Sequence, residues 1–85
     1  MLTKIIKRDG REVAFDRVKI ADAIYKAAQV LGGKDYEMAQ DLAEKVETYV
    51  ENTIQGRIPT VEEVQDAVEH TLIENGHART AKEYI

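Results

Sequence analysis

The dipeptide Asp9-Gly10, set between two short runs of β-forming residues, is the feature that most constrains how this chain begins to fold. The runs are residues 2–7 and 12–15, and Asp-Gly between such runs predicts a β-hairpin with a two-residue type I′ loop. The cross-strand pairs expected from that loop are Arg8 with Arg11, Lys7 with Glu12, and Ile6 with Val13. One face of the hairpin is then apolar and can pack, while the charged face can meet a ligand.

Positive charge gathers on this hairpin although the chain as a whole is acidic. The formal net charge is −4, from 12 basic and 16 acidic residues. Residues 1–19 hold six basic residues and three acidic ones, which gives this segment a net charge of +3. A local basic patch can hold a small polyanion such as a nucleoside triphosphate, whereas the acidic remainder disfavours general nucleic-acid binding. The alternative is that the basic residues only protect an exposed strand edge.

Length and composition limit the remaining possibilities. The 85 residues suffice for one domain with a modest core. The sequence has no cysteine, which excludes disulfides and thiolate chemistry. It also has no apolar segment of the length that a membrane span or a secretory signal requires. We therefore expect a soluble, cytoplasmic chain that meets no membrane.

Apolar residues at helical spacing predict two helices after the hairpin. The first is expected from Arg17 to about Leu31, with Asp16 as its N-cap. Its predicted core positions are Ile20, Ile24, Ala27 and Leu31. The second is expected to begin after the N-cap Asp35 and to end before Gly56. Its predicted core positions are Ala39, Leu42, Val46, Val50 and Ile54.

The second half of the chain predicts two more helices. Thr60 and Glu63 form a capping box, so a third helix is expected from Val61 to the Asn75-Gly76 pair. Its predicted stripe comprises Val61, Val64, Val68 and Leu72, flanked by Ala67 and Ile73. Ile58 precedes a proline and is expected to add a short third strand. A fourth helix begins near His77, and the end of the chain cuts it short.

These elements together predict an α+β fold. We expect a small N-terminal β-hairpin, extended to three short strands if Ile58 pairs, packed as a lid on a bundle of about four helices. The sequence contains no Ser-His-Asp arrangement, Walker loop or Gly-x-Gly-x-x-Gly motif. His70 and His77 each lack a second ligand at a metal-binding spacing. We therefore expect a domain without catalytic residues and without a metal site of its own.

The motif from Lys7 to Arg11, followed by Val13, Phe15-Asp16 and Lys19-Ile20, resembles the start of the ATP-cone domain. This domain is the nucleotide-sensing module at the amino terminus of ribonucleotide reductases. Residues 61–69 and 78–85 are similar to its last two helices, so the resemblance covers essentially the whole chain. In its sequence detail, the chain most resembles the cones of anaerobic ribonucleoside-triphosphate reductases, or those of the cobalamin-dependent reductases. The resemblance implies that residues 1–85 are one cone domain, excised from the amino terminus of a longer protein.

The resemblance implies a regulatory site that binds ATP or dATP with Mg²⁺ between the hairpin and the helices. That site would control the overall activity of the parent ribonucleoside-triphosphate reductase in deoxyribonucleotide synthesis. The implied nucleotide-binding residues are Lys7, Arg8, Glu12, Val13, Ala14, Phe15, Asp16, Arg17, Val18 and Thr60. Among them, Lys7 and Arg8 would bind the triphosphate, Thr60 the phosphates or their metal ion, Val18 the adenine, and Asp16 the base or ribose. The implied partners are adenine nucleotides, the catalytic body of the reductase and another cone in an oligomer, with no nucleic acid.

Two departures from the family pattern, and two other functions, stand beside this interpretation. The chain stops at Ile85, where some cones continue with further basic residues, and it has Val64 where certain aerobic reductase cones have histidine. One alternative is the cone of a nucleotide-dependent transcriptional repressor of reductase genes. Such repressors join a zinc ribbon to the cone, and this chain has no cysteine. The other alternative is an interaction module that binds no nucleotide, in which the basic hairpin only protects an edge.

Overall fold

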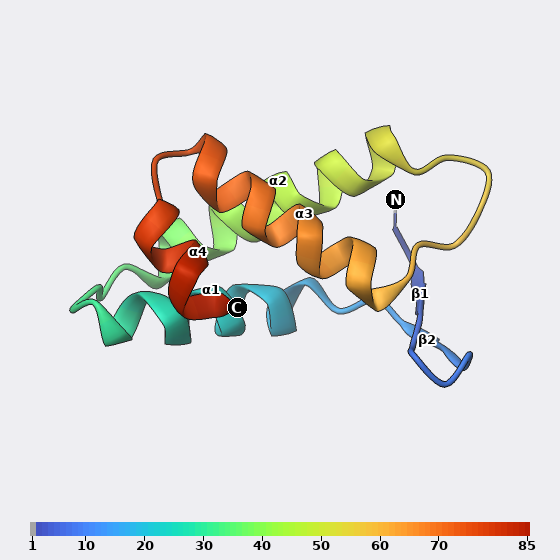
Figure 1. The fold of residues 1–85 in the computed structure, drawn as a ribbon, viewed down its shortest axis with the longest axis horizontal. Helices are drawn as coiled ribbons and strands as arrows, with labels where there is room; N and C mark the ends of the chain where they lie inside the picture. The colour runs from blue at the N-terminus through green and yellow to red at the C-terminus, as the bar shows by residue number, and fades with distance from the viewer. Residues whose placement is uncertain (1) are drawn as a thin grey trace.

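A two-stranded antiparallel hairpin followed by four helices makes up the computed structural model, which describes residues 2–85 (Figure 1). The strands are β1, Lys4–Ile6, and β2, Glu12–Ala14. The helices are α1, Arg17–Val30; α2, Tyr36–Thr53; α3, Val61–Glu74; and α4, Ala78–Tyr84. The predicted α+β class, with a small hairpin on a four-helix bundle, is confirmed. Within residues 2–85, no helix combines the length and the apolar character needed to cross a membrane.

The first three helices begin at the cap residues that the sequence predicts. Asp16 Oδ1 accepts a hydrogen bond from Val18 N at 3.0 Å, and Asp35 caps α2 in the same manner. Thr60 and Glu63 form the expected capping box at the start of α3. These bonds satisfy backbone amides that have no partner within the helix, so the three helix starts are defined by local chemistry.

The hydrophobic core lies where the four helices meet. α1 and α3 each pack against both α2 and α4. The innermost residues comprise most of the predicted stripes, together with Ala81 of α4: Ile24, Ala39, Leu42, Val46, Val50, Val64, Ala67, Val68, Leu72 and Ala81. The apolar patterns of α2 and α3 are therefore confirmed as the centre of the fold.

Leu31, which was predicted to face the core, and Ile73, which was predicted to flank the buried stripe of the third helix, are both exposed. Leu31 is 39% exposed because α1 ends at Val30 and Leu31 forms its C-cap. Small residues of α1, among them Ala21 and Ala28, are buried against the neighbouring helices. Ile73 is 51% exposed because it follows the fully buried Leu72, and one residue turns the side chain by about 100° around the helix.

The hairpin has a three-residue loop, so the predicted two-residue type I′ loop is wrong. Lys7 N donates to Arg11 O at 2.8 Å, and Gly10 N donates to Lys7 O at 2.9 Å. A type I′ loop needs positive φ at both central residues, but only Gly10, with φ +89°, has it. The observed pairs are Lys4 with Ala14, Ile5 with Val13, and Ile6 with Glu12. The predicted pairs of Arg8 with Arg11, Lys7 with Glu12, and Ile6 with Val13 are therefore wrong by one position.

Side-chain bonds and core packing both favour this wider loop. The Asp9 carboxylate accepts from Arg11 N at 3.1 Å and from Arg11 Nε at 2.6 Å. These two bonds, the backbone one foremost, lower the pKa of Asp9. The observed register also directs Ile5 against the helical core, with Val13 as its partner across the strands. Ile6 then lies on the other face of the hairpin, beside Glu12.

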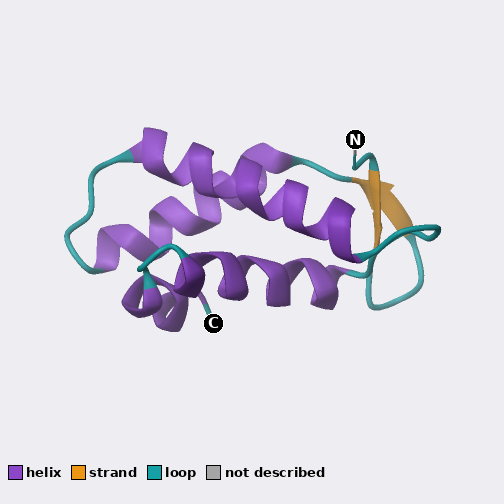
Figure 2. Cartoon of the chain, turned by 90° about the horizontal axis from the view of Figure 1, so that it is seen from above, coloured by secondary structure: helices purple, strands orange, loops and turns teal. Residues whose placement is uncertain are grey.

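The expected third strand is reduced to a single bridge, which lies at Thr60 instead of Ile58. Ile6 pairs with Thr60 in parallel, and Ile6 N donates to Pro59 O at 2.9 Å. Pro59 has no N–H, so it cannot contribute both bonds of a regular strand. This bridge attaches the hairpin to the segment leading into α3, at one end of the helical body (Figure 2).

Candidate functional site

A surface pocket of about 340 Å³ lies between the hairpin turn and the start of α3. Its lining combines two cations, one carboxylate, one apolar side chain and one amide: Lys7, Arg8, Asp9, Val61 and Gln65. Val61 and Gln65 are four residues apart and therefore share one face of α3. The bridge that precedes α3 brings the hairpin turn over this face. The pocket thus depends on contact between segments that are far apart in the sequence.

The cations of the hairpin differ in what holds them. Lys4 and Arg11 pair with carboxylates of the hairpin itself, at N–O distances of 3.7 and 2.6 Å. Arg8 reaches α3, where its Nε lies 3.1 Å from Glu62 Oε2. Lys7 is exposed and makes no salt bridge to any residue between 2 and 85. Its ammonium group is therefore ready to receive an anion.

Thr60 is held firmly at the start of α3 by a charged network. Glu63 accepts two bonds from the Arg57 guanidinium, at 2.8 and 2.5 Å, and one from Thr60 N at 2.9 Å. The bonds from Arg57, together with those from Thr60, lower the pKa of Glu63 from its ordinary 4.5 to about 2. Thr60 Oγ1 donates to Glu63 Oε1 at 3.1 Å and accepts from Glu63 N at 3.2 Å. The hydroxyl predicted to meet phosphates is thus already bonded within the cap.

The return strand places its predicted site residues on different sides of the hairpin. Glu12 and Ala14 are exposed, with Glu12 paired to Lys4 on the face away from the core. Val13 is half-buried, and Phe15 packs against the core. Neither Glu12 nor any other residue of this strand lines the pocket between the turn and α3.

The remaining predicted residues lie at the start of α1. Asp16 caps this helix, while Arg17 and Val18 line a separate groove of about 250 Å³ between α1 and α2. Arg17 Nη1 is 3.3 Å from Glu47 Oε1, and Val18 is 59% exposed. The structure therefore places Lys7 and Arg8 beside the start of α3, but places Arg17 and Val18 in a different hollow.

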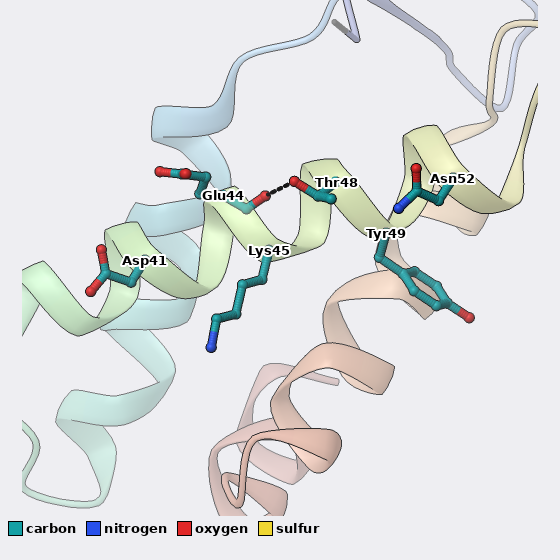
Figure 3. A pocket seen from close by; sticks show the side chains of 6 residues that line it. All are labelled: Asp41, Glu44, Lys45, Thr48, Tyr49 and Asn52. Carbon is teal, nitrogen blue, oxygen red and sulfur yellow. Dashed lines mark hydrogen bonds between the residues drawn. The ribbon is translucent and has the colours of Figure 1, made fainter.

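A larger hollow of about 450 Å³ runs along α2 (Figure 3). All six side chains that line it come from this one helix: Asp41, Glu44, Lys45, Thr48, Tyr49 and Asn52. Lys45 Nζ donates to Asn75 Oδ1 at 2.9 Å, and the Tyr49 ring stacks on His70 with centroids 4.5 Å apart. Because two carboxylates line this hollow and its lysine is already bonded, it is a poor place for a triphosphate.

Sequence reasoning missed two residues of α3 that bear on the site: Gln65, which lines the pocket, and Glu62, which pairs with Arg8. The signal for Gln65 was present, because a helix starting at Val61 carries Gln65 on the same face one turn later. Glu62 has no comparable signal, since its contact with Arg8 joins residues 54 positions apart in the chain. Only the docking of the hairpin on α3 reveals that pair.

The chain matches known proteins over nearly its full length. Residues 3–85 match the family model of the ATP cone domain. The chain is 38% identical over 73 residues to a vitamin B12-dependent ribonucleoside-diphosphate reductase of Thermoplasma acidophilum, which covers 86% of this chain and 9% of that protein. It is 32% identical over 85 residues to an anaerobic ribonucleoside-triphosphate reductase of Salmonella typhimurium, which covers 100% of this chain and 12% of that protein. The hairpin, the helix order and these matches agree, and the chain belongs to the ATP cone domain family.

Proposed function

We propose that this domain binds ATP and dATP between the hairpin turn and the start of α3, and that it regulates a ribonucleotide reductase of which it forms a part. The observation that carries the proposal is the placement of Lys7 and Arg8 over Val61 and Gln65 in one pocket. Ammonium and guanidinium groups are the side chains that bind phosphates most strongly. The N-terminus of α3 adds the positive end of a helix dipole.

The matched relatives support the second half of the proposal. They are reductases that act on ribonucleoside diphosphates or triphosphates, and this chain spans 9% and 12% of the length of the two described above. A module that occupies so small a part of a reductase is suited to sensing a nucleotide. In this proposal the chemistry takes place elsewhere in the parent protein.

The Mg²⁺ ion is proposed to arrive with the triphosphate. Residues 2–85 contain no group of three His, Cys, Asp or Glu side chains arranged to hold a metal. Mg²⁺ needs no such group here, because it commonly keeps several waters and binds through phosphates with one or two protein oxygens. Thr60, at the start of α3, supplies an oxygen atom of the suitable kind. The ion would neutralise part of the triphosphate charge.

The base and ribose are proposed to lie toward the return strand and its junction with α1. This assignment keeps Glu12, Val13, Ala14, Phe15, Asp16, Arg17 and Val18 in the site, as the family resemblance implies. The nucleotide would then extend from the turn beneath the hairpin toward α1. Arg17 and Val18 line a separate groove in the nucleotide-free domain, so this arrangement requires the hairpin to adjust when the nucleotide binds.

Regulation requires that ATP and dATP act differently although they share the triphosphate. A ligand shifts an equilibrium only through a difference in its affinity for two states. One hydrogen bond between a buried polar group and the ribose hydroxyl supplies about 1–2 kcal/mol, or roughly five- to thirtyfold. In this proposal ATP favours the active state of the parent reductase, and dATP favours an inhibited assembly.

Calorimetric titration of the 85-residue domain with ATP, dATP and GTP in magnesium buffer tests the proposal. We expect saturable binding of both adenine nucleotides and much weaker binding of GTP. The Lys7→Ala/Arg8→Ala variant should lose at least about tenfold in affinity, because charge-assisted hydrogen bonds contribute about 1.5–3 kcal/mol each.

A matched control is the Lys26→Ala/Lys34→Ala variant, which removes the same charge from exposed positions on α1 and just beyond it. This control should bind ATP as the unmodified domain does. Unchanged ATP binding by a folded Lys7→Ala/Arg8→Ala variant would show that the hairpin is not the phosphate clamp.

A further inference from the structure

Two adjacent carboxylates at the start of α3 form bonds with side chains that the proposed nucleotide would bind. Glu62 Oε2 lies 3.1 Å from Arg8 Nε. Glu63 Oε1 accepts from the hydroxyl of Thr60 at 3.1 Å. In the nucleotide-free domain, both carboxylates therefore stand where phosphate oxygens would otherwise be received.

The two carboxylates differ greatly in how easily they can be displaced. Glu63 is bonded to both Nη atoms of Arg57 and to the amide and hydroxyl of Thr60, and these bonds lower its pKa to about 2. Glu62 makes a single contact to Arg8, and the two side chains are 48% and 74% exposed. Exposed single ion pairs of this kind contribute little to stability. Glu63 is therefore fixed, whereas Glu62 is exchangeable.

Arg8 is held by Glu62 and, among residues 2–85, makes no other salt bridge. A triphosphate carries more negative charge than a carboxylate and presents several oxygens, so it forms stronger charge-assisted bonds to a guanidinium. Lys7, which forms no salt bridge with any residue from 2 to 85, can hold the incoming phosphate while Arg8 changes partner. The lining of the pocket thus contains Lys7, which no salt bridge within residues 2–85 holds, and Arg8, whose internal partner can leave.

We infer that Glu62 is an internal competitor of the nucleotide: its carboxylate occupies the Arg8 guanidinium in the free domain, and a phosphate of the bound nucleotide replaces it. The inference rests on the proposed function and adds the residue that sets the affinity of the same site. Every binding event that engages Arg8 must break the Arg8–Glu62 pair. The strength of that pair is therefore subtracted from the binding free energy of ATP.

Titration of Glu62→Gln with ATP in magnesium buffer is the direct test. An exposed ion pair is worth a factor of roughly 1.5 to 5 in an equilibrium constant, so Glu62→Gln should bind ATP tighter than the unmodified domain by that factor. Glu74→Gln removes the same charge from an exposed position at the far end of α3 and should leave the affinity unchanged. In an Arg8→Ala background, Glu62→Gln should have no effect, because Glu62 acts through Arg8.

Four outcomes separate this inference from its alternatives. Unchanged or weaker ATP binding by Glu62→Gln overturns it, and so does an equal gain in Glu74→Gln or a persisting gain without Arg8. Where Glu62→Gln fails to fold by circular dichroism, Glu62→Asp replaces it in the ATP titration. Aspartate keeps the charge but shortens the reach to Arg8 by one methylene, so its ATP affinity is compared with that of the unmodified domain in the same way. An unmodified folded domain that binds no ATP overturns the proposed function and this inference together, whereas normal ATP binding with an unaffected Glu62→Gln overturns the inference alone.

Discussion

Glu63 shows how one side chain can organise the end of a helix. Its carboxylate accepts from the amide and hydroxyl of Thr60 and from two nitrogens of Arg57. These bonds tie the loop before Pro59 to the first turn of α3, where the hairpin also attaches through Thr60. The charged form of Glu63 is therefore part of the folded structure.

The stability of the domain should decrease as the pH falls from about 4.5 to about 2, in part through Glu63. The folded pKa lies below the unfolded one, so the unfolded chain binds the proton more tightly, and the stabilisation present above the unfolded pKa is lost as the pH falls through the folded pKa. Urea unfolding across this pH range measures the loss, and Glu63→Gln should show a shallower pH dependence. Arg57→Gln should make this loss smaller and end it at a higher pH, since it removes the largest cause of the lowered pKa. Equal pH slopes in the unmodified domain and Glu63→Gln would contradict this assignment.

Among the elements of the fold, the hairpin is the one whose detailed shape matters most to the proposed site. Its turn carries Lys7 and Arg8, and the left-handed Gly10 closes the loop between them and Arg11. A Cβ placed on Gly10 would meet no atom within 4 Å, so the need for glycine there is conformational and not steric.

Gly10→Ala should destabilise the domain by about 1–2 kcal/mol, because alanine is strained in the left-handed region. For a domain of this size, a loss of about 1 kcal/mol lowers the melting temperature by roughly 4–8 °C. Gly10→Asn should lose less, since asparagine tolerates this conformation. Thermal unfolding followed by circular dichroism gives both values. Equal melting temperatures for the alanine and asparagine variants would mean that the turn does not depend on the left-handed conformation.

On the scale of the whole molecule, four helices share one small core, and its residues come from every helix. A domain of this length has a total stability of only about 4–13 kcal/mol. A single large side chain at the centre therefore accounts for a considerable part of the total. Leu72, which is completely buried, is such a residue.

Leu72→Ala should cost about 2–5 kcal/mol through lost burial and the cavity left behind. Its neighbour on α3 provides the control, because Ile73 is half exposed and Ile73→Ala should change stability by no more than about 0.5 kcal/mol. Denaturant unfolding of both variants makes the comparison at adjacent positions. Similar losses in the two would mean that the core is not where the structure places it.

The sequence alone determined the local features of this domain. The structure confirms the three predicted helix caps, Asp16, Asp35 and Thr60. They could be predicted because a cap bonds to amides only a few residues away in the sequence. The stripes of α2 and α3 were equally readable, since helical spacing selects one face without reference to the rest of the chain. The presence of a hairpin at Asp9-Gly10 followed from turn chemistry in the same way.

The tertiary structure decided everything that depends on how separate elements dock. Ile5 rather than Ile6 faces the core, because the register adapts to the helices beneath the hairpin. Arg8 meets Glu62 only because the hairpin attaches before α3, and Arg17 and Val18 line another groove because α1 continues along α2. Contacts across such distances in sequence are set by the packing of the whole core, and a local pattern carries no information about them.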